Sequence, residues 1–237
     1  MEILVCAATS TEARACRSGV RAAGCSELIE VLQTGMGQEN ARNALELRLE
    51  RAPRPRLVVS SGFAGACGAG IPLRSWVTAG EIVATGQASS PLRFAAYPFT
   101  DTGALLCCLA SSTELLVSKE MRERVAAGLP QPAAVDMESA GLAEAAQSRG
   151  IPLLVWRTVT DTVEAPLPDF LHSYAAAMSR SVSSARMRNG LGVLAAAAIR
   201  HPWVFARLAR NISISSRVLR EGWERHAARI AEIARSA

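Results

Sequence analysis

The amino-acid sequence predicts an α/β protein with a mixed, mainly parallel central sheet flanked by helices, followed by a helical C-terminal extension. The first observation is that short apolar runs alternate with helical stretches, as in folds that cover a sheet on both faces. The second is that these runs are nearly continuous, which is typical of strands buried on both sides. The third is an arginine-rich amphipathic segment after residue 190. We therefore divide the chain into a main domain over 1–189 and a basic amphipathic helical tail over 190–237.

In the first half of the chain, each apolar run is followed by residues that typically end a strand or begin a helix. A helix is expected to begin at Thr9–Glu12. Another follows the Gly35–Gly37 segment and continues to Arg51, where Pro53–Pro55 breaks it. Gly62–Gly65 predicts a tight strand-to-helix turn, in which glycine relieves steric crowding. Strands are predicted over 2–8, 28–33, 57–61 and 76–85.

In the second half, residues 86–112 are polar and contain proline, and we assign no element to them. Ile151–Thr160 is the clearest central strand, because it is apolar, rich in β-branched residues and free of breaks. Further strands are expected over 114–118 and 133–136. Helices are expected over 119–128, from 137 to 149, over 168–188 and in the tail.

Composition and charge restrict the class of protein. Hydrophobic residues make up 49% of the 237 residues and charged residues 20%, which excludes long disorder and indicates a sizeable core. The net charge is +5. From Ile199 onward there are eight arginines and three glutamates, a balance of +5, so the main domain is close to neutral.

The cysteines and the N-terminus indicate the compartment. The six cysteines form no C-x-x-C pair and the three histidines lie far apart, so we expect free thiols in a reducing compartment and no metal site. The N-terminus lacks the features of a signal peptide, and no apolar run reaches membrane-spanning length. We expect a cytoplasmic protein.

Polar side chains follow four of the predicted strands, where ligands of open α/β sheets bind. Each has an ordinary alternative: Glu12 as an exposed helix residue, Glu138 as a partner of a helix dipole, and Asp161 as a helix cap. Arg157 lies within an apolar strand, where a guanidinium needs an anionic partner. A structural ion pair and an active-site role both remain open for it. The glycines of 62–65 fit either a simple turn or a close approach of backbone N–H groups to a ligand.

Together these segments resemble the nucleoside phosphorylase and nucleosidase superfamily. Val135-Asp136-Met137-Glu138-Ser139-Ala140 is similar to its ribose-binding Met-Glu signature, and Val155–Asp161 to its strand that ends in the catalytic aspartate. Residues 61–65 and 34–41 resemble its glycine segments. Glu12 falls where the bacterial methylthioadenosine/S-adenosylhomocysteine nucleosidases keep an acidic residue. The resemblance covers roughly residues 1–185 and implies an enzyme that cleaves the N-glycosidic bond of a purine nucleoside and releases adenine.

The resemblance also implies the roles of the residues. Asp161 would protonate the purine at N7, because adenine leaves poorly as an anion. Glu138 would hold the ribose hydroxyls and favour the charge of an oxocarbenium-like transition state. Glu12 and Arg157 would lie near the nucleophile. The other substrate-binding candidates are Met137, Asp136, Phe63, Ala64, Gly65 and Ser118.

The nucleophile stays open between water and phosphate. Phe63 occupies the place of a serine that helps to hold water in the hydrolytic relatives, and Ser60 stands near the place of an arginine that binds phosphate in hexameric phosphorylases. No cofactor is expected, with inorganic phosphate as the co-substrate if the reaction is phosphorolysis. A homo-oligomer is expected, with a dimer favoured by the nucleosidase-like Glu12.

The tail resembles the C-terminal extension of hopanoid-associated phosphorylases, around Pro202–Arg210. This resemblance implies adenosylhopane, a lipid-linked nucleoside, as substrate; the alternatives are methylthioadenosine, S-adenosylhomocysteine or futalosine. A basic amphipathic segment with Trp203 and Phe205 suits the inner face of a membrane, and it suits equally a helix packed on the main domain or a dimer contact. A nucleic-acid partner is not expected, because interleaved lysine and aromatic residues are absent. The alternative from another class of function is a non-catalytic scaffold that binds nucleosides or associates with membranes.

Overall fold

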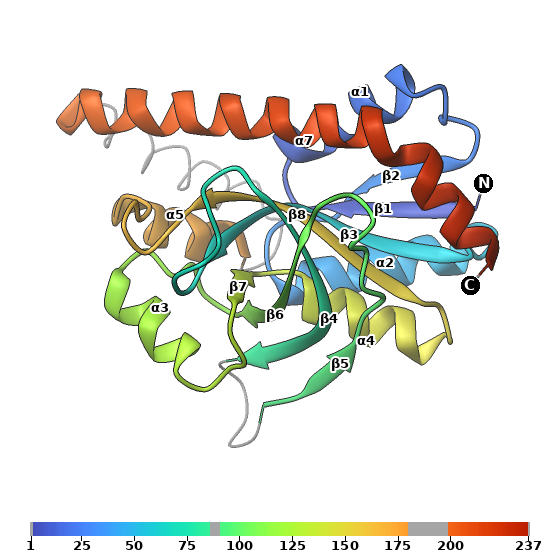
Figure 1. Ribbon diagram of the computed structural model, residues 1–237, viewed down its shortest axis with the longest axis horizontal. Helices are drawn as coiled ribbons and strands as arrows, with labels where there is room; N and C mark the ends of the chain where they lie inside the picture. The colour runs from blue at the N-terminus through green and yellow to red at the C-terminus, as the bar shows by residue number, and fades with distance from the viewer. Residues whose placement is uncertain (1, 86–90, 180–198, 237) are drawn as a thin grey trace.

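The computed structural model describes residues 2–85, 91–179 and 199–236. Its strands form one eight-stranded sheet with helices on both faces (Figure 1), so the predicted α/β class is confirmed. Five of the strand pairings are parallel and three are antiparallel. The elements in chain order are β1 (Ile3–Ala7), α1 (Ser10–Ala22), β2 (Ile29–Gln33), α2 (Gln38–Arg51), β3 (Leu57–Ala66), β4 (Trp76–Thr85), β5 (Arg93–Ala95), β6 (Leu105–Ser112), α3 (Lys119–Ala126), β7 (Ala133–Asp136), α4 (Ser139–Ser148), β8 (Leu153–Asp161), α5 (Phe170–Ser179) and α7 (Pro202–Ser236).

The strand order brings distant segments of the chain together. The sheet is ordered β2-β1-β3-β7-β6-β4-β5, and β8 pairs with both β3 and β4, so that β3, β7, β6, β4 and β8 close into a ring. Every residue of β8 is buried, as the continuous apolar run indicates. The parallel pairing of β8 with β3 sets Asp161 opposite Gly65. The ring therefore brings the end of β8 to the glycine segment of β3.

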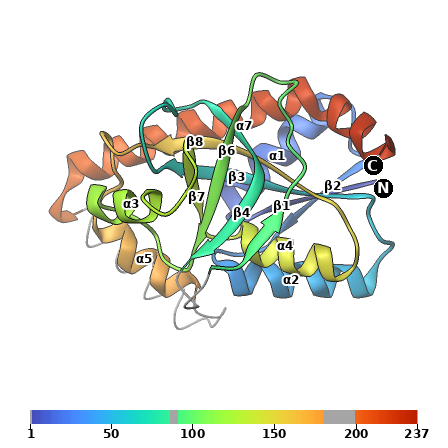
Figure 2. The ribbon, with the colours of Figure 1, turned by 60° about the horizontal axis from the view of Figure 1, so that its bottom comes forward.

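Two helix layers cover the sheet. Helices α1 and α7 lie on one face and α2 and α4 on the other, as both views show (Figures 1 and 2). One core cluster joins α2 and α4 to the sheet through residues such as Leu45 and Leu142, and a second joins α1 and α7 through residues such as Val20 and Trp223. The six cysteines are all buried thiols.

Helix α7 shares a core with the sheet. Trp223 is fully buried, its ring centroid 5.1 Å from that of Trp156, and its indole N–H donates to the Ser61 hydroxyl at 3.0 Å. A Cβ at Gly19 of α1 would lie 2.3 Å from a backbone oxygen of α7, so only glycine allows the two helices to approach this closely. The boundary expected near residue 190 lies outside the described residues. None of the described helices is both long and apolar enough to cross a membrane.

Two expectations for local structure were wrong, and one region holds strands that the sequence did not indicate. Gly62–Gly65 is not a turn, because β3 continues through it to Ala66. The segment expected as a strand over 114–118 forms none, and its last residue caps α3 instead. Residues 86–112, left unassigned, contain β5 and β6. The helix expected over 168–188 is seen as α5 up to Ser179, and its remainder lies outside the described residues.

Candidate active site

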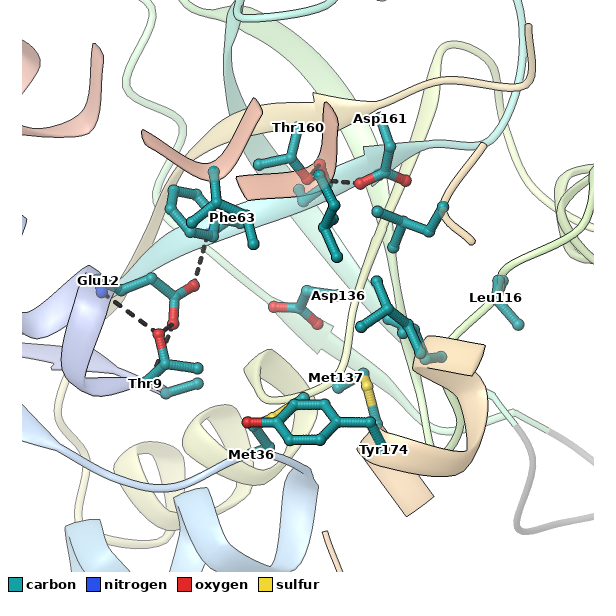
Figure 3. A pocket seen from close by; sticks show the side chains of 18 of the residues that line it. Thr9, Glu12, Met36, Phe63, Leu116, Asp136, Met137, Thr160, Asp161 and Tyr174 are labelled. Carbon is teal, nitrogen blue, oxygen red and sulfur yellow. Dashed lines mark hydrogen bonds between the residues drawn. The ribbon is translucent and has the colours of Figure 1, made fainter. Parts of the chain in front are cut away.

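A cavity of about 390 Å³ lies where several strands end. Its walls include residues directly after β1, the last part of β3 and the ends of β7 and β8, as expected for ligand sites of α/β sheets. Figure 3 shows Glu12 and Asp161 on opposite sides of this cavity, with Asp136 between them in the view. The cavity brings together eight of the ten predicted site residues: Glu12, Phe63, Ala64, Gly65, Asp136, Met137, Glu138 and Asp161.

Glu12 is held at the start of α1 by a capping box. Thr9 is the N-cap of this helix, and its hydroxyl accepts a hydrogen bond from the Glu12 N–H, while one Glu12 carboxylate oxygen accepts from the Thr9 N–H at 2.8 Å and from its hydroxyl at 2.6 Å. The other oxygen accepts from the Phe63 N–H at 2.8 Å (Figure 3). Gly62, at φ +147°, permits this contact, since a Cβ there would lie 2.4 Å from Glu12 Oε1. The side chain is therefore buried and fixed rather than an exposed helix residue.

Arg157 lies behind the cavity wall at the centre of a charged network. Its guanidinium contacts Asp136 at 2.8 Å and Glu138 at 3.4 Å, and it donates to the Phe63 carbonyl at 2.9 Å. Asp136 also accepts hydrogen bonds from the N–H and hydroxyl of Ser139 at the start of α4. The structure thus pairs Arg157 with both acidic residues of the Met-Glu motif and orients their carboxylates.

Glu138 lies directly before α4 and lines the cavity. Its carboxylate accepts a hydrogen bond from the Gly37 N–H at 3.0 Å, which joins it to the glycine segment before α2. Burial raises the pKa of Glu138 to about 7, and the neighbouring Arg157 guanidinium opposes this effect. Burial thus favours the protonated form of Glu138, and Arg157 favours the carboxylate, which is the form that would accept hydrogen bonds from ribose hydroxyls.

Asp161, at the end of β8, forms a buried ion pair with Arg122 of α3. Burial raises the pKa of Asp161 above its ordinary value, while the Arg122 guanidinium and the Thr160 hydroxyl lower it. Arg122 also donates to the carbonyls of Leu116 and Ala66, at 3.0 and 3.2 Å, so its position is fixed from three sides. Burial therefore favours the protonated form of Asp161 at the cavity, whereas the Arg122 guanidinium favours the carboxylate.

Sequence reasoning missed Arg122, since it lies on a helix rich in charged residues and carries no signal of burial. It also missed the apolar side of the cavity, to which α5 and α7 contribute. Ser118, predicted to bind substrate, lies outside the cavity lining, and its hydroxyl caps α3 by accepting from the Met121 N–H at 3.2 Å. The missed apolar residues include Met36, Leu116, Leu171, Tyr174, Phe205 and Leu208.

Among the described residues, no three His, Cys, Asp or Glu side chains lie close enough together to hold a metal ion.

The architecture is similar to that of solved nucleosidases. The 5′-methylthioadenosine/S-adenosylhomocysteine nucleosidase of Helicobacter pylori superposes with a TM-score of 0.63 at 14% identity, covering 97% of this chain and 98% of that one. The chain has the fold of these nucleosidases. The S-adenosylhomocysteine nucleosidase of Streptococcus pyogenes gives 0.63 at 15% identity, covering 94% and 96%, and a Helicobacter pylori futalosine hydrolase mutant gives 0.56 at 15%, covering 90% and 98%. No protein-family model matches the sequence, and no curated protein matches it.

On this nucleosidase fold, the ring formed by β3, β7, β6, β4 and β8 places Asp136, Glu138 and Asp161 at the cavity, and the start of α1 adds Glu12. The C-terminal helix belongs to the same fold, and its first half supplies part of the cavity wall.

Proposed function

We propose that this protein hydrolyses the N-glycosidic bond of a purine nucleoside and releases adenine. One observation carries the proposal: Asp161, Glu138 and Glu12, which come from three distant segments, line one cavity large enough for a nucleoside. The similarity to nucleosidases supports the same reaction class.

In the proposed reaction, the bond between C1′ and the purine N9 breaks while Asp161, in the protonated form that its burial favours, gives its proton to N7. The base leaves as neutral adenine, and an oxocarbenium-like ribosyl group develops. The Glu138 carboxylate binds the sugar hydroxyls and stabilises the positive charge. Glu12 accepts a proton from the water that attacks C1′, which leaves a free ribose with its 5′ substituent.

The charges of the site favour water over phosphate. Five acidic side chains line the cavity, and the two guanidiniums nearby, Arg122 and Arg157, are already paired with three of them. The N–H groups of Thr9, Gly37 and Phe63 donate to Glu12 or Glu138 and not to an empty anion site. A phosphate dianion would meet excess negative charge. We therefore propose hydrolysis, with no cofactor. The acidic lining residues are Glu12, Glu114, Asp136, Glu138 and Asp161.

The apolar wall supports a nucleoside with an apolar 5′ substituent, and we propose adenosylhopane as the substrate. Phe205 and Leu208 at the start of α7 contribute to this wall. Ile199 and Trp203, just before them, are 82% and 87% exposed. Residues 199–220 contain five arginines and no acidic residue, which suits an anionic membrane surface. A hydrocarbon longer than the cavity would leave it along this segment.

The experiment measures adenine by chromatography after incubation with adenosylhopane, a 5′-alkyl adenosine or methylthioadenosine, each with and without phosphate. We expect release without phosphate and preference for the larger apolar substituent. Asp161→Asn should lower turnover by about 10²–10⁴-fold, the usual contribution of a general acid. Absence of adenine in every condition would indicate a nucleoside-binding scaffold. A strict need for phosphate would contradict hydrolysis, and a preference for methylthioadenosine would favour the small 5′-thio nucleosides.

A further inference from the structure

A second cavity, of about 360 Å³, shares a wall with the first, formed by Asp161, Leu167, Leu208 and Asn211. Its other walls come from the segment before β4, the loop after β8 and the first half of α7. Glu12 and Glu138, which surround the sugar and the nucleophile in the proposed reaction, do not line it. Of the proposed bond-cleaving groups, Asp161 alone borders the second cavity, and Glu12 and Glu138 face only the first.

Three arginines give this cavity its charge. Arg207 and Arg210 lie three residues apart on α7, and Arg74 approaches from the segment before β4. None of the three guanidiniums has an ion pair or a hydrogen bond with a described residue. By contrast, Arg220 and Arg229, further along the same helix, are paired with carboxylates.

The acidic groups nearby do not neutralise these arginines. Among the described residues of the lining, Asp161 is the one carboxylate, and it is already paired with the buried Arg122. Glu164 and Asp169, on either side of the loop, lie outside the lining. The cavity thus presents a surplus of positive charge.

The backbone of Arg74 is a second, independent sign of a built site. Arg74 has φ +69° and is the single non-glycine residue with positive φ in the described part of the chain. Its N–H donates to the Val159 carbonyl at 2.8 Å, which holds it in this unfavourable conformation. Residues in sparsely populated backbone conformations cluster at active sites and ligand-binding sites.

We propose that the second cavity binds a phosphate group carried on a ligand with an apolar part. Three guanidiniums match the charge and oxygen geometry of a phosphate better than those of a single carboxylate. Leu73, Pro166 and Ile214 complete the wall with apolar surface, which a bare ion would not need. The phosphate group can belong to a soluble ligand or to the headgroup of an anionic phospholipid, and both sources present the same chemistry to the arginines.

The test measures binding directly, so it is independent of whether adenine is released. The full chain is titrated with pyrophosphate by calorimetry and mixed in a flotation assay with vesicles of phosphatidylcholine, with or without phosphatidylglycerol. The test variants are Arg207→Ala/Arg210→Ala and Arg74→Ala. The control, Arg217→Ala/Arg225→Ala, removes the same charge from exposed positions of α7 outside the cavity.

We expect the wild type to bind pyrophosphate or the phosphatidylglycerol vesicles. The double cavity variant should weaken that binding by about tenfold or more, since each lost guanidinium removes charge-assisted hydrogen bonds. The control should change it less than about threefold. Binding of pyrophosphate identifies a soluble phosphate ligand, and binding of vesicles alone identifies a lipid headgroup. No binding to either probe, or equal weakening by the control, would overturn the proposal.

Discussion

Gly62→Ala tests whether Glu12 owes its position to the missing side chain at residue 62. A Cβ there would lie 2.4 Å from Glu12 Oε1, so the carboxylate must retreat by about 1 Å to reach an ordinary contact of 3.4 Å. This movement breaks the 2.8 Å hydrogen bond from the Phe63 N–H. Loss of a charged hydrogen bond and the strain at φ +147° together should lower the free energy of unfolding by about 2.5–6 kcal/mol. A displacement of about 1 Å should also lower kcat for adenine release by about 100-fold.

The matched control is Gly70→Ala. Gly70 also has a positive φ, of +92°, but a Cβ there meets no atom within 4 Å. This variant should lose only the backbone strain, about 1–3 kcal/mol, and keep its kcat. Stability is measured by urea unfolding, and kcat at a temperature at which both variants are folded. If folded Gly62→Ala keeps the kcat of Gly70→Ala, the position of Glu12 does not depend on Gly62 and the reasoning fails.

Three further substitutions, one of them with a matched control, test the charges and the core. Arg122→Met should lower the free energy of unfolding by about 3–5 kcal/mol at pH 8, because it leaves the Asp161 carboxylate buried without its partner. Because Arg122 lowers the pKa of Asp161, this pKa should rise in the variant, and the loss should shrink at pH 5; equal losses at the two pH values would argue against the pair. Glu138→Gln should gain stability relative to the wild type as pH rises from about 4.5 to about 7. The folded-state pKa of Glu138, about 7, exceeds the ordinary 4.5, so the folded protein binds the proton more tightly than the unfolded chain. The wild type therefore loses the contribution of this proton to its free energy of unfolding over that pH range, and the variant does not. A difference independent of pH would contradict the raised pKa. Trp223→Ala should cost about 3–5 kcal/mol in global unfolding, whereas Trp203→Ala at an exposed position should stay within about 0.5 kcal/mol. Equal effects would mean that α7 unfolds apart from the sheet.

The strands with continuous apolar runs could be predicted from the sequence, because a strand buried on both faces consists almost entirely of apolar residues. Strand β6 could not, because its polar end, Ser111–Ser112, and the proline-containing residues before it resemble a loop. For the Gly62–Gly65 segment, the structure contradicts the turn and leaves the approach of its N–H groups to a ligand a prediction. Its glycines do not turn the chain; they leave room for carboxylates, since a Cβ at Gly65 would lie 2.7 Å from Asp161. The sequence shows that Gly62 and Gly65 have no side chain, but it does not show which distant group occupies the space.

Among the charged residues of the site, too, the sequence identifies some and not others. Arg157 could be singled out because a guanidinium in an apolar strand requires an anion, and Asp136 and Glu138 supply it. Arg122 lies among charged residues on α3, where exposure is the ordinary expectation, and only the fold brings Asp161 to it. For the tail, helical periodicity fits packing and membrane contact equally well. The structure buries Trp223 and leaves Trp203 exposed on the same helix.

The four tryptophans also divide the intrinsic fluorescence of the protein into two signals. Trp76 and Trp156 stack with ring centroids 4.0 Å apart, and Trp223 meets Trp156 edge-on, so these three indoles form one coupled chromophore inside the protein. Trp203 is 87% exposed and stands alone. Iodide should quench the emission of Trp203 and leave that of the cluster, and near-ultraviolet circular dichroism should report the stacked pair. One unlabelled sample can therefore distinguish an event at the start of α7 from melting of the interior.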